Sequence, residues 1–393
     1  MTTADSAAPP SGPVVAVVGG GQLARMMAEP AAALGIPLRL LAEAPGVSAA
    51  QVIPDHTVGD YTDLATLRAL VKGCEVVTFD HEHVPTHHLH ALEDDGVLVR
   101  PGPEAQVHAQ DKVVMRQALD RIGAPTPRHR VVTDADEVAD FGFPCVLKTS
   151  RGGYDGKGVW FVSTPEECAE AFETAARSGV RILAEERVDF RRELSALVAR
   201  APSGQAAAYP VVESLQVDGI CREVIAPAPG LDPGLAARAE ELALRIAGEL
   251  GVTGILAVEL FETDDGRVLV NELAMRPHNT GHWTQDGAVT SQFENHLRAV
   301  LDLPLGSPAP RARWTVMVNI LGGPSDSGGR LYDGYPHALA RDPHLRVHLY
   351  GKDPRPGRKV GHVNAYGDDL QECLERARHA AAWFAGELGD ESE

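Results

Sequence analysis

The sequence is poor in cysteine and in long hydrophobic runs, and each shortage excludes a class of protein. Its five cysteines are scattered, odd in number and never in CxxC spacing, which predicts neither a disulfide framework nor a structural zinc site. No apolar run reaches the roughly 18 residues of a membrane span. Residues 1–13 lack the apolar centre of a secretory signal. We therefore expect a cytoplasmic protein with no membrane partner.

Positive charge is also in short supply. The chain carries 36 Lys and Arg residues against 55 Asp and Glu residues, a formal net charge of −19. A field of this sign repels nucleic acid and anionic lipid, so no nucleic-acid partner is predicted, and any anionic ligand must be held by local basic residues. The chain does have length and apolar content. With 393 residues, 44% of them hydrophobic, it can form two or three packed domains.

The expected elements divide the chain into a tail and three domains. Residues 1–13 are rich in Ala, Pro, Ser and Thr and are predicted to be a disordered tail. Residues 14–126 alternate apolar strands with helices, which predicts a parallel sheet. Residues 127–197 place two strands around a glycine-rich loop, which favours a small antiparallel lid. Residues 198–393 form a C-terminal domain, giving a mixed α/β and α+β protein.

A glycine turn follows the first expected strand. Gly19, Gly21 and Ala24 match the G-x-G-x-x-G/A fingerprint. Glu43 ends the next strand, where a ribose-binding acid would lie in a dinucleotide enzyme. The same glycines would also admit a phosphate at the helix N-terminus or serve tight packing, so the turn leaves all three interpretations open. Pro30 predicts an interruption of the helix that follows.

The strongest chemical signal is a predicted hairpin over residues 254–273. The pair Asp265-Gly266 is a favoured two-residue loop with positive φ at both positions, and this register sets Glu259 opposite Glu272. Facing carboxylates destabilise a sheet, and an unpaired buried carboxylate is costly. A hard divalent cation completed by substrate phosphates would compensate both, so we predict that these glutamates bind Mg²⁺.

The same register makes a second, more detailed prediction. It places Phe261 opposite Val270. Asn271, adjacent to Glu272, could reach the same ion or the other side of the sheet through a bulge at the strand end. The alternative is a shifted register in which Glu259 points to solvent.

Basic and glycine-rich segments accompany the carboxylates. Lys148 lies at the end of a strand before the loop 152–158, so an ammonium group is delivered beside flexible backbone donors, as polyphosphate binding requires. The Walker A spacing is absent, and an ordinary hairpin with solvated lysines is the alternative. Residues 352–359 hold four cations framed by Pro and Gly, which favours a clasp for a phosphate group.

Polar residues also follow the strand that ends near residue 79. Asp80 and Glu82 are candidate site residues because open α/β sheets bind ligands beyond the carboxyl ends of their strands. The five histidines between residues 81 and 90 have neither paired-cysteine nor HExxH spacing, so they do not predict a metal site.

Five segments in order, GGGQLARM, KTSRGGYDGKG, E-x₂-V…E, VNELAMRPHNTGHWT and YGKDPRPGRKVGH, resemble the 5-(carboxyamino)imidazole ribonucleotide synthetase family of purine biosynthesis. The resemblance extends from Val14 over nearly the whole chain. It implies an ATP-grasp fold with an N-terminal parallel-sheet domain, a small antiparallel lid domain and a C-terminal domain. The implied reaction carboxylates 5-aminoimidazole ribonucleotide with bicarbonate and ATP through carboxyphosphate, and the family commonly forms homodimers.

The resemblance also implies roles for individual residues. The nucleotide would be bound by Lys112, Lys148, Gly153, Tyr154, Asp155, Gly156, Lys157, Gly158, Val159, Glu185, Glu186, Arg187, Val188, Glu193, Gln216, Asn271 and Glu272. Magnesium would be held by Glu259 and Glu272. The catalytic residues around bicarbonate and carboxyphosphate would be Lys148, Arg276, His278, Asn279 and Lys352, with Asp155 taking the amine proton. The aminoimidazole ribonucleotide would be bound by Gln22, Asp80, Glu82, Tyr154, Asp155, Lys352, Arg355 and Arg358.

Three positions depart from the family pattern. Lys157 stands where an arginine is usual, which keeps the charge but loses the bidentate fork. Asp80 shortens one acid of a common E-x-E, and Gln216 stands where the family often has histidine.

Three rival functions remain to be weighed. A nicotinamide-dependent dehydrogenase would use the first glycine turn but leaves the paired carboxylates and the C-terminal cations without a role. A different ATP-grasp ligase, such as a formate-using glycinamide ribonucleotide enzyme, would share the lysine, the lid and the acids. A non-catalytic nucleotide sensor on the same fold should have lost an acid or the lid lysine, and this chain retains them.

Overall fold

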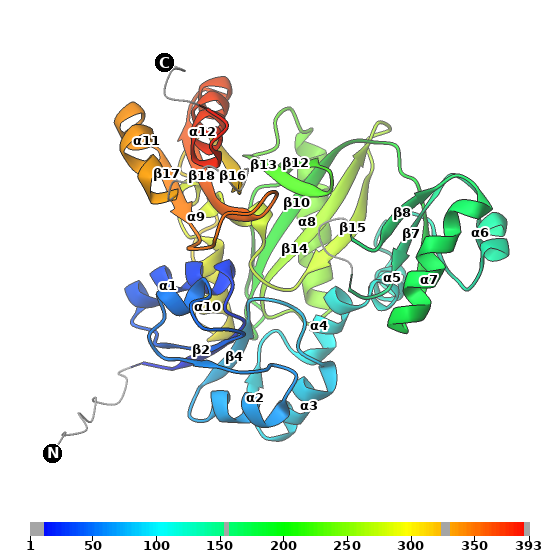
Figure 1. Cartoon of the computed structure of the whole chain (residues 1–393), viewed down its shortest axis with the longest axis horizontal. Coiled ribbons are helices and arrows are strands. Elements are labelled where there is room, and N and C mark those ends of the chain that lie inside the picture. The colour runs from blue at the N-terminus through cyan, green and yellow to red at the C-terminus, as the bar shows by residue number, and fades with distance from the viewer. Residues whose placement is uncertain (1–11, 153–156, 324–330, 389–393) are drawn as a thin grey trace. The chain divides into compact units, whose positions relative to one another are not determined.

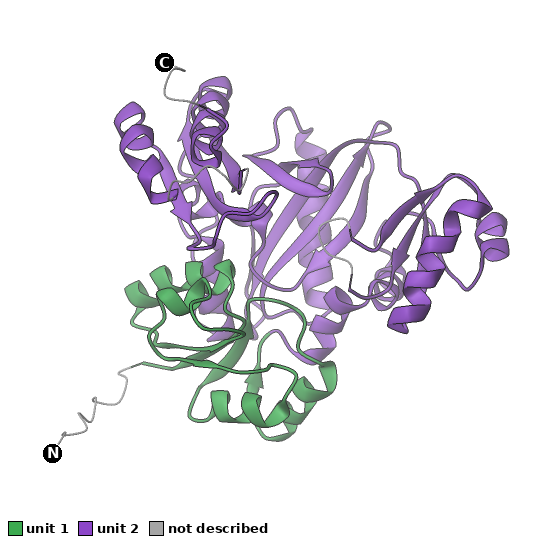
Figure 2. Ribbon diagram, viewed as in Figure 1, with its two compact units in different colours: residues 1–100 green, residues 101–393 purple. Residues whose placement is uncertain are grey.

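The computed structural model describes residues 12–152, 157–323 and 331–388 (Figure 1). The chain divides into two compact units, residues 1–100 and residues 101–393 (Figure 2). Of the predicted tail, residues 1–11 lie outside the described part of the chain. The predicted domain boundaries at residues 126 and 197 stay predictions.

The first unit is built on a parallel sheet, as the alternation of strands and helices predicted. The strands run in the order β3-β2-β1-β4-β5 and all their pairings are parallel. Their bounds are β1 Val15–Val18, β2 Leu38–Ala42, β3 His56–Val58, β4 Val76–Phe79 and β5 Leu98–Val99. The helices are α1 Gln22–Leu34, α2 Leu64–Val71 and α3 Thr86–Asp94, with a 3₁₀ turn at Ala49–Gln51. Strands β1 and β4 are buried throughout, which is typical of parallel strands covered on both faces.

The interruption predicted at Pro30 is wrong. Helix α1 continues through the proline to Leu34. Met27 and Ala31, on either side of Pro30, are buried, so the burial of this face compensates for the backbone hydrogen bond that proline cannot donate.

The second unit contains a large antiparallel sheet. Its nine strands follow the order β15-β14-β10-β12-β13-β16-β18-β17, with β11 paired to β10. Their bounds are β10 Phe190–Arg200, β11 Ala206–Ala208, β12 Val212–Val217, β13 Ile220–Ala226, β14 Gly254–Thr263, β15 Val268–Ala274, β16 Trp314–Leu321, β17 Arg346–Leu349 and β18 Lys359–Gly367. All of these pairings are antiparallel.

A second, smaller sheet in this unit confirms the prediction of antiparallel strands around the glycine-rich loop. It runs β6-β9-β7-β8, with β7 antiparallel to both of its neighbours. The bounds are β6 His129–Val132, β7 Cys145–Thr149, β8 Val159–Val162 and β9 Ile182–Glu186. Helices α6 Ala135–Phe141 and α7 Ala169–Ser178 accompany it, with a 3₁₀ turn at Pro165–Cys168.

The remaining helices of the described chain belong to this second unit. They are α4 Pro103–Gln110, α5 Lys112–Arg121, α8 Pro233–Glu249, α9 Thr284–Gly287, α10 Gln292–Val300, α11 Tyr335–Arg341 and α12 Leu370–Ala385, with 3₁₀ turns at Asn279–Gly281 and Leu331–Gly334. Helix α8 packs on β10 and β14 through a buried face that includes Leu242 and Ile246. Helix α12 packs on β16 and β18. None of the helices in the described ranges is long and apolar enough to cross a membrane.

Candidate functional site

The site is organised by the hairpin of β14 and β15, where Glu259 lies directly opposite Glu272 as predicted. The ladder is irregular at this point. Leu260 pairs with Val270 and Glu259 with Glu272, so Asn271 is the extra residue of a β-bulge. Bulges redirect side chains and interrupt pairing, and they are common beside functional sites.

The route to this pairing differs from the prediction. Thr263 N–H donates to Arg267 O at 3.0 Å and Gly266 N–H donates to Thr263 O at 2.9 Å. The loop therefore holds three residues, and within it only Gly266, at φ 76°, has a positive φ. Phe261 faces Leu269 rather than Val270. The predicted register is wrong by one residue beside the turn, and the bulge at Asn271 restores the facing glutamates.

A buried arginine holds this bulge in place. Arg116 on α5 is 1% exposed. Its two Nη groups donate to Val270 O at 3.0 Å and Asn271 O at 2.8 Å, while Nε donates to Glu185 Oε1 at 2.6 Å. The guanidinium fork thus fixes two consecutive carbonyl groups and one carboxylate, a geometry that lysine cannot reproduce. Arg116 is not among the site residues predicted from the sequence. The signal that could have indicated it is a cation among the buried positions Val113, Met115 and Leu119, which requires an internal anion.

Glu185, at the end of β9, is the anion that this cation requires. Its second oxygen accepts from Lys148 Nζ at 2.7 Å, and Lys148 Nζ also donates to Asn271 Oδ1 at 3.2 Å. Burial raises the pKa of Glu185, but Lys148 and Arg116 outweigh burial and hold it at about 2. The Glu185 side chain is therefore an ionised partner of both cations. Its predicted neighbour Glu186 accepts from Arg128 N–H at 2.9 Å, and Arg187 is exposed.

The facing glutamates have opposite electrostatic environments. Burial raises the pKa of Glu259 to about 8, and the nearby charges of Glu272 and Glu193 add to the rise. Burial also raises the pKa of Glu272, but Lys112 makes a short ion pair with its Oε1 and the net pKa is lowered. Like charges on neighbouring carboxylates separate their pKa values in this way. The strand pair therefore holds one ionised glutamate and one that favours its protonated form.

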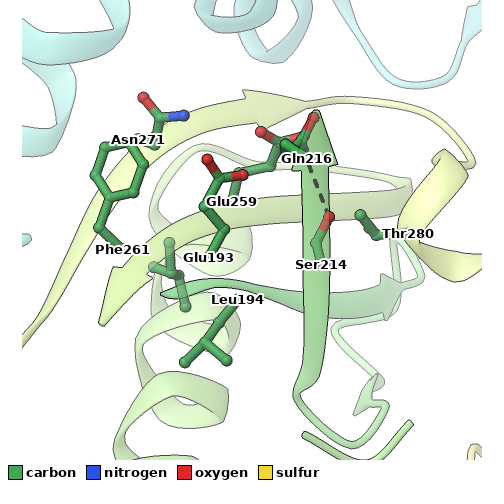
Figure 3. Close-up of a pocket in the computed structure, with 9 residues that line it drawn as sticks. Glu193, Leu194, Ser214, Gln216, Glu259, Phe261, Asn271 and Thr280 are labelled. Atoms are coloured by element: carbon green, nitrogen blue, oxygen red, sulfur yellow. Dashed lines mark hydrogen bonds between the residues drawn. The ribbon is translucent and has the colours of Figure 1, made fainter. Parts of the chain in front are cut away.

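A third acid, Glu193, lines a pocket together with Glu259 (Figure 3). Burial raises the pKa of Glu193, on β10, to about 7, while the Gln216 amide and Lys148 lower it in part. Figure 3 shows Glu193, Glu259 and Gln216 converging on one side of the sheet. The pocket is lined by Glu193, Leu194, Ser214, Gln216, Glu259, Leu260, Phe261, Asn271 and Thr280. Five predicted site residues, Lys112, Lys148, Glu193, Gln216 and Asn271, therefore lie around the facing glutamates.

The segment after β15 brings a further set of predicted residues to the same place. His278 Nε2 lies 3.3 Å from Glu259 Oε1. Asn279 exchanges two side-chain hydrogen bonds with Asn319, at 3.0 and 2.8 Å. Arg276 is half-buried, and its Nη1 donates to Pro277 O at 3.2 Å. Burial, with the charges of Arg276 and Lys359 adding to it, lowers the pKa of His278 well below its usual value, so its imidazole is neutral.

The predicted C-terminal cations lie on the segment between β17 and β18. Lys352 Nζ is 5.8 Å from the centre of the Tyr350 ring, and Arg358 Nη1 donates to Asp353 O at 3.2 Å. Arg355 and Arg358 are exposed. The neighbouring Lys359, which was not among the predicted site residues, is close enough to lower the pKa of Glu259. This end of the segment is therefore electrostatically coupled to Glu259.

The predicted lid residues are only partly described. Gly153, Tyr154, Asp155 and Gly156 lie outside the described residues. Lys157 is exposed, and Gly158, at φ 69°, precedes β8. Val159 pairs with Lys148 across β7 and β8, which sets the end of this loop beside the lysine that contacts Glu185.

In the first unit, the chain's own acids occupy the glycine turn. Asp80 Oδ1 accepts from Ala24 N–H at 2.7 Å, and Glu43 Oε2 accepts from Gly20 N–H at 2.9 Å. A Cβ on Gly21 would collide with the Asp80 carboxylate. Of the three interpretations left open, this geometry favours tight packing, because two backbone donors of the turn already bind carboxylates. Gln22 begins α1, and Glu82 is half-buried two residues beyond Asp80.

Metal coordination in the described part of the chain depends on the facing glutamates. Within the described ranges, no group of three or more His, Cys, Asp or Glu side chains is arranged to hold a metal ion. The facing glutamates offer two carboxylates, and a hard cation there would take its remaining oxygen ligands from a substrate or from water. All five cysteines are free thiols.

Three family models match successive parts of the chain. The Ribonucleotide synthetase preATP-grasp domain matches residues 13–110 and the ATP-grasp domain residues 117–293. The Phosphoribosylaminoimidazole carboxylase C-terminal domain matches residues 315–376. These matches account for the parallel sheet, the antiparallel sheets and the C-terminal strands in chain order.

Two relatives and one solved structure resemble this chain over nearly its whole length. The N5-carboxyaminoimidazole ribonucleotide synthase of Mycobacterium tuberculosis is 54% identical over 377 residues, covering 95% of this chain and 88% of the relative. That of Corynebacterium ammoniagenes is 52% identical over 381 residues, with coverages of 95% and 92%. An Aspergillus clavatus structure in complex with ADP and 5-aminoimidazole ribonucleotide has a TM-score of 0.86 at 31% identity, covering 96% of this chain and 99% of that one. This chain belongs to the N5-carboxyaminoimidazole ribonucleotide synthase family of ATP-grasp enzymes.

Proposed function

We propose that this chain is an ATP-dependent ligase that carboxylates 5-aminoimidazole ribonucleotide with bicarbonate, giving N5-carboxyaminoimidazole ribonucleotide, ADP and phosphate. The main structural support is the pair of facing glutamates, Glu259 and Glu272, which lies beside Lys112 and Lys148. Family membership supports the same reaction, because relatives 52–54% identical over nearly the whole chain bear the name of that enzyme.

The donor set fits Mg²⁺ and a polyphosphate. Glu259 and Glu272 supply hard oxygen ligands. The pKa of Glu259 is raised by burial and by the neighbouring acids, so its ionised form would gain from a nearby positive charge. Magnesium binds one or two carboxylates and completes its shell with phosphate oxygens and water. When bound, the ion would neutralise charge on the transferring phosphoryl group. Lys112 and Lys148 would contact the other phosphate oxygens.

The chain's own residues would perform the first chemical step by positioning. Bicarbonate is a weak nucleophile, so rate must come from holding it in line with the terminal phosphoryl group. Arg276, His278, Asn279 and Lys352 would surround it. A bicarbonate oxygen attacks the terminal phosphorus of ATP and ADP leaves, which produces carboxyphosphate. The lid residues 153–159 would supply backbone donors and exclude water, because hydrolysis of carboxyphosphate would waste the ATP.

The second step transfers CO₂ to the substrate amine. Carboxyphosphate releases phosphate and CO₂, and the amine nitrogen attacks the CO₂ carbon while a base removes the amine proton. We assign that proton to Asp155. Gln22, Tyr154, Arg355 and Arg358 would bind the ribonucleotide, with its phosphate at the C-terminal cations. We also propose that Asp80 and Glu82 contact this substrate. The protein is further proposed to be a cytoplasmic homodimer.

The test measures ADP release by the purified protein with ATP and Mg²⁺. We expect ADP release to require both bicarbonate and 5-aminoimidazole ribonucleotide, and the carboxylated product to form in equal amount. Stimulation by formate with glycinamide ribonucleotide would instead support the other ATP-grasp ligase. Absence of any ATP turnover, with reduction of a nicotinamide cofactor, would revive the dehydrogenase. The engagement of Glu43 with Gly20 N–H argues against that reading.

A further inference from the structure

His278 lies in a network of side chains that the sequence did not anticipate. Ser195, on β10, is paired with Glu259 across the sheet. Ser195 Oγ is 2.7 Å from Thr280 Oγ1, and Thr280 Oγ1 is 2.9 Å from His278 Nδ1. His278 Nε2 then returns to Glu259 Oε1 at 3.3 Å. Ser195 and Thr280 are both buried, so water does not compete for the contact between their hydroxyl groups.

One contact in this network fixes which group donates in each of the other hydrogen bonds. Thr280 N–H donates to His278 Nδ1 at 3.4 Å. A backbone N–H is only ever a donor, so Nδ1 must accept, and a neutral imidazole that accepts at Nδ1 carries its proton on Nε2. The Thr280 hydroxyl therefore also donates to Nδ1. Because its single proton is then used, its oxygen accepts the proton of Ser195.

The backbone of His278 is held independently by Gln292 at the start of α10. Gln292 is fully buried. Its Oε1 accepts from His278 N–H at 2.8 Å, and its Nε2 donates to His278 O at 2.8 Å and to His282 Nδ1 at 3.0 Å. A Cβ on Gly281 would collide with the Gln292 amide, so the segment runs directly against this side chain. The imidazole thus has a fixed position as well as a fixed orientation.

We propose that Thr280, supported by Ser195, is a positioning residue that locks His278 in the Nε2–H tautomer and so makes it a neutral hydrogen-bond donor in the site. The proposal deepens the proposed function and rests on it for the identity of the anion. His278 Nε2–H is directed at Glu259 and at the place assigned to bicarbonate. In this tautomer Nε2 has no lone pair with which to accept a proton or to bind a metal ion. His278 therefore stabilises negative charge on oxygen and is not the general base.

The test has a spectroscopic arm that does not depend on turnover. In full-length protein with ¹⁵N-labelled histidine, long-range ¹H–¹⁵N correlation distinguishes the two tautomers, and His278→Gln identifies the signal. We expect His278 to be protonated on Nε2 alone, also in Thr280→Ser. Thr280→Val removes the hydroxyl donor, which contributes about a factor of ten to the tautomer ratio, so a second, Nδ1–H population should appear. Ser195→Ala should produce a smaller shift in the same direction.

The kinetic arm separates positioning from structure. For Thr280→Val we expect kcat for ADP release to fall about tenfold, with a raised KM for bicarbonate and an unchanged KM for ATP. Thr280→Ser should restore kcat to within about twofold. The matched control is Thr315→Val, because the Thr315 hydroxyl is buried without a hydrogen-bond partner among the described residues, and this variant should keep both the kinetics and the His278 signal.

Two results would overturn the proposal. One is a wild-type His278 protonated on Nδ1. The other is a Thr280→Val protein with an unchanged tautomer and an unchanged KM for bicarbonate. If instead the unmodified protein shows no ADP release that depends on bicarbonate and 5-aminoimidazole ribonucleotide, the proposed function fails. The tautomer of His278 in the unmodified and Thr280 variants still decides this proposal.

Discussion

Replacing Arg116 tests whether the bulge that presents Asn271 and Glu272 depends on one guanidinium group. The side chain is 1% exposed and donates three hydrogen bonds, to Glu185, Val270 and Asn271. Removing one partner of a buried ion pair costs about 3–5 kcal/mol, because the other charge stays buried. Glu185 keeps Lys148 as a second partner, which offsets part of this cost. We therefore expect Arg116→Met to lose about 3 kcal/mol of the free energy of unfolding.

Arg116→Lys refines the same prediction. Lysine keeps the charge beside Glu185 but cannot hold two consecutive carbonyl groups with a planar fork. Each lost hydrogen bond from a charged donor is worth about 1.5–3 kcal/mol when measured alone, and the losses are not additive. We expect this variant to lose about 2 kcal/mol and, because the bulge is released, to need more Mg²⁺ for ADP release.

The assay is urea denaturation followed by circular dichroism, together with the Mg²⁺ dependence of ADP release. Arg245→Met is the matched control, since Arg245 Nη1 donates to Ile122 O at 2.8 Å in an exposed contact, and its loss should cost less than about 1 kcal/mol. An Arg116→Met protein that matches this control in urea midpoint and in Mg²⁺ dependence would refute the reasoning.

Three further predictions concern the carboxylates. Glu272→Gln should weaken Mg²⁺ binding, so that half-maximal ADP release needs at least about tenfold more Mg²⁺, as measured by Mg²⁺ titration. Because the folded pKa of Glu259 is about 8, Mg²⁺ affinity should rise as pH increases toward 8, with proton uptake by the buffer in calorimetry. Because the folded pKa of Glu185 is lowered to about 2, its stabilisation is present above about pH 4.3 and lost as pH falls through 2. In Glu185→Gln, the urea midpoint should depend less on pH over that range than in the unmodified protein.

The hairpin shows how far sequence reasoning reaches. Turn chemistry and charge placed Glu259 opposite Glu272, and the structure confirms the pair. The loop prediction failed because Asp-Gly occurs both in two-residue turns and at the end of three-residue loops that close on a left-handed glycine. The compensating bulge at Asn271 depends on Arg116, which is 154 residues from Val270 in sequence. No local pattern contains that contact.

The glycine turn illustrates the opposite limit. Its pattern fitted a cofactor, a phosphate or packing equally well, because all three use the same exposed amides. What distinguishes them is the identity of the anion, and here Asp80 reaches Ala24 N–H from 56 residues away. Likewise, nothing in RPHNTGHWT shows that Thr280 will meet Ser195. The residue types of a site can be read from sequence, whereas the hydrogen-bond directions within it follow from tertiary contacts.

The charge distribution predicts that the site binds a cation together with a polyphosphate. Glu193, Glu259 and Glu272 lie on the neighbouring strands β10, β14 and β15, and Glu185 lies on β9 of the smaller sheet. All four acids are buried or half-buried. Glu185 is compensated by two cations and Glu272 by Lys112, whereas the contact of Glu259 is a neutral imidazole. Binding a polyphosphate alone would draw Lys112 and Lys148 toward the ligand and deprive the acids of their partners. A divalent cation restores the balance, so nucleotide and metal should bind cooperatively.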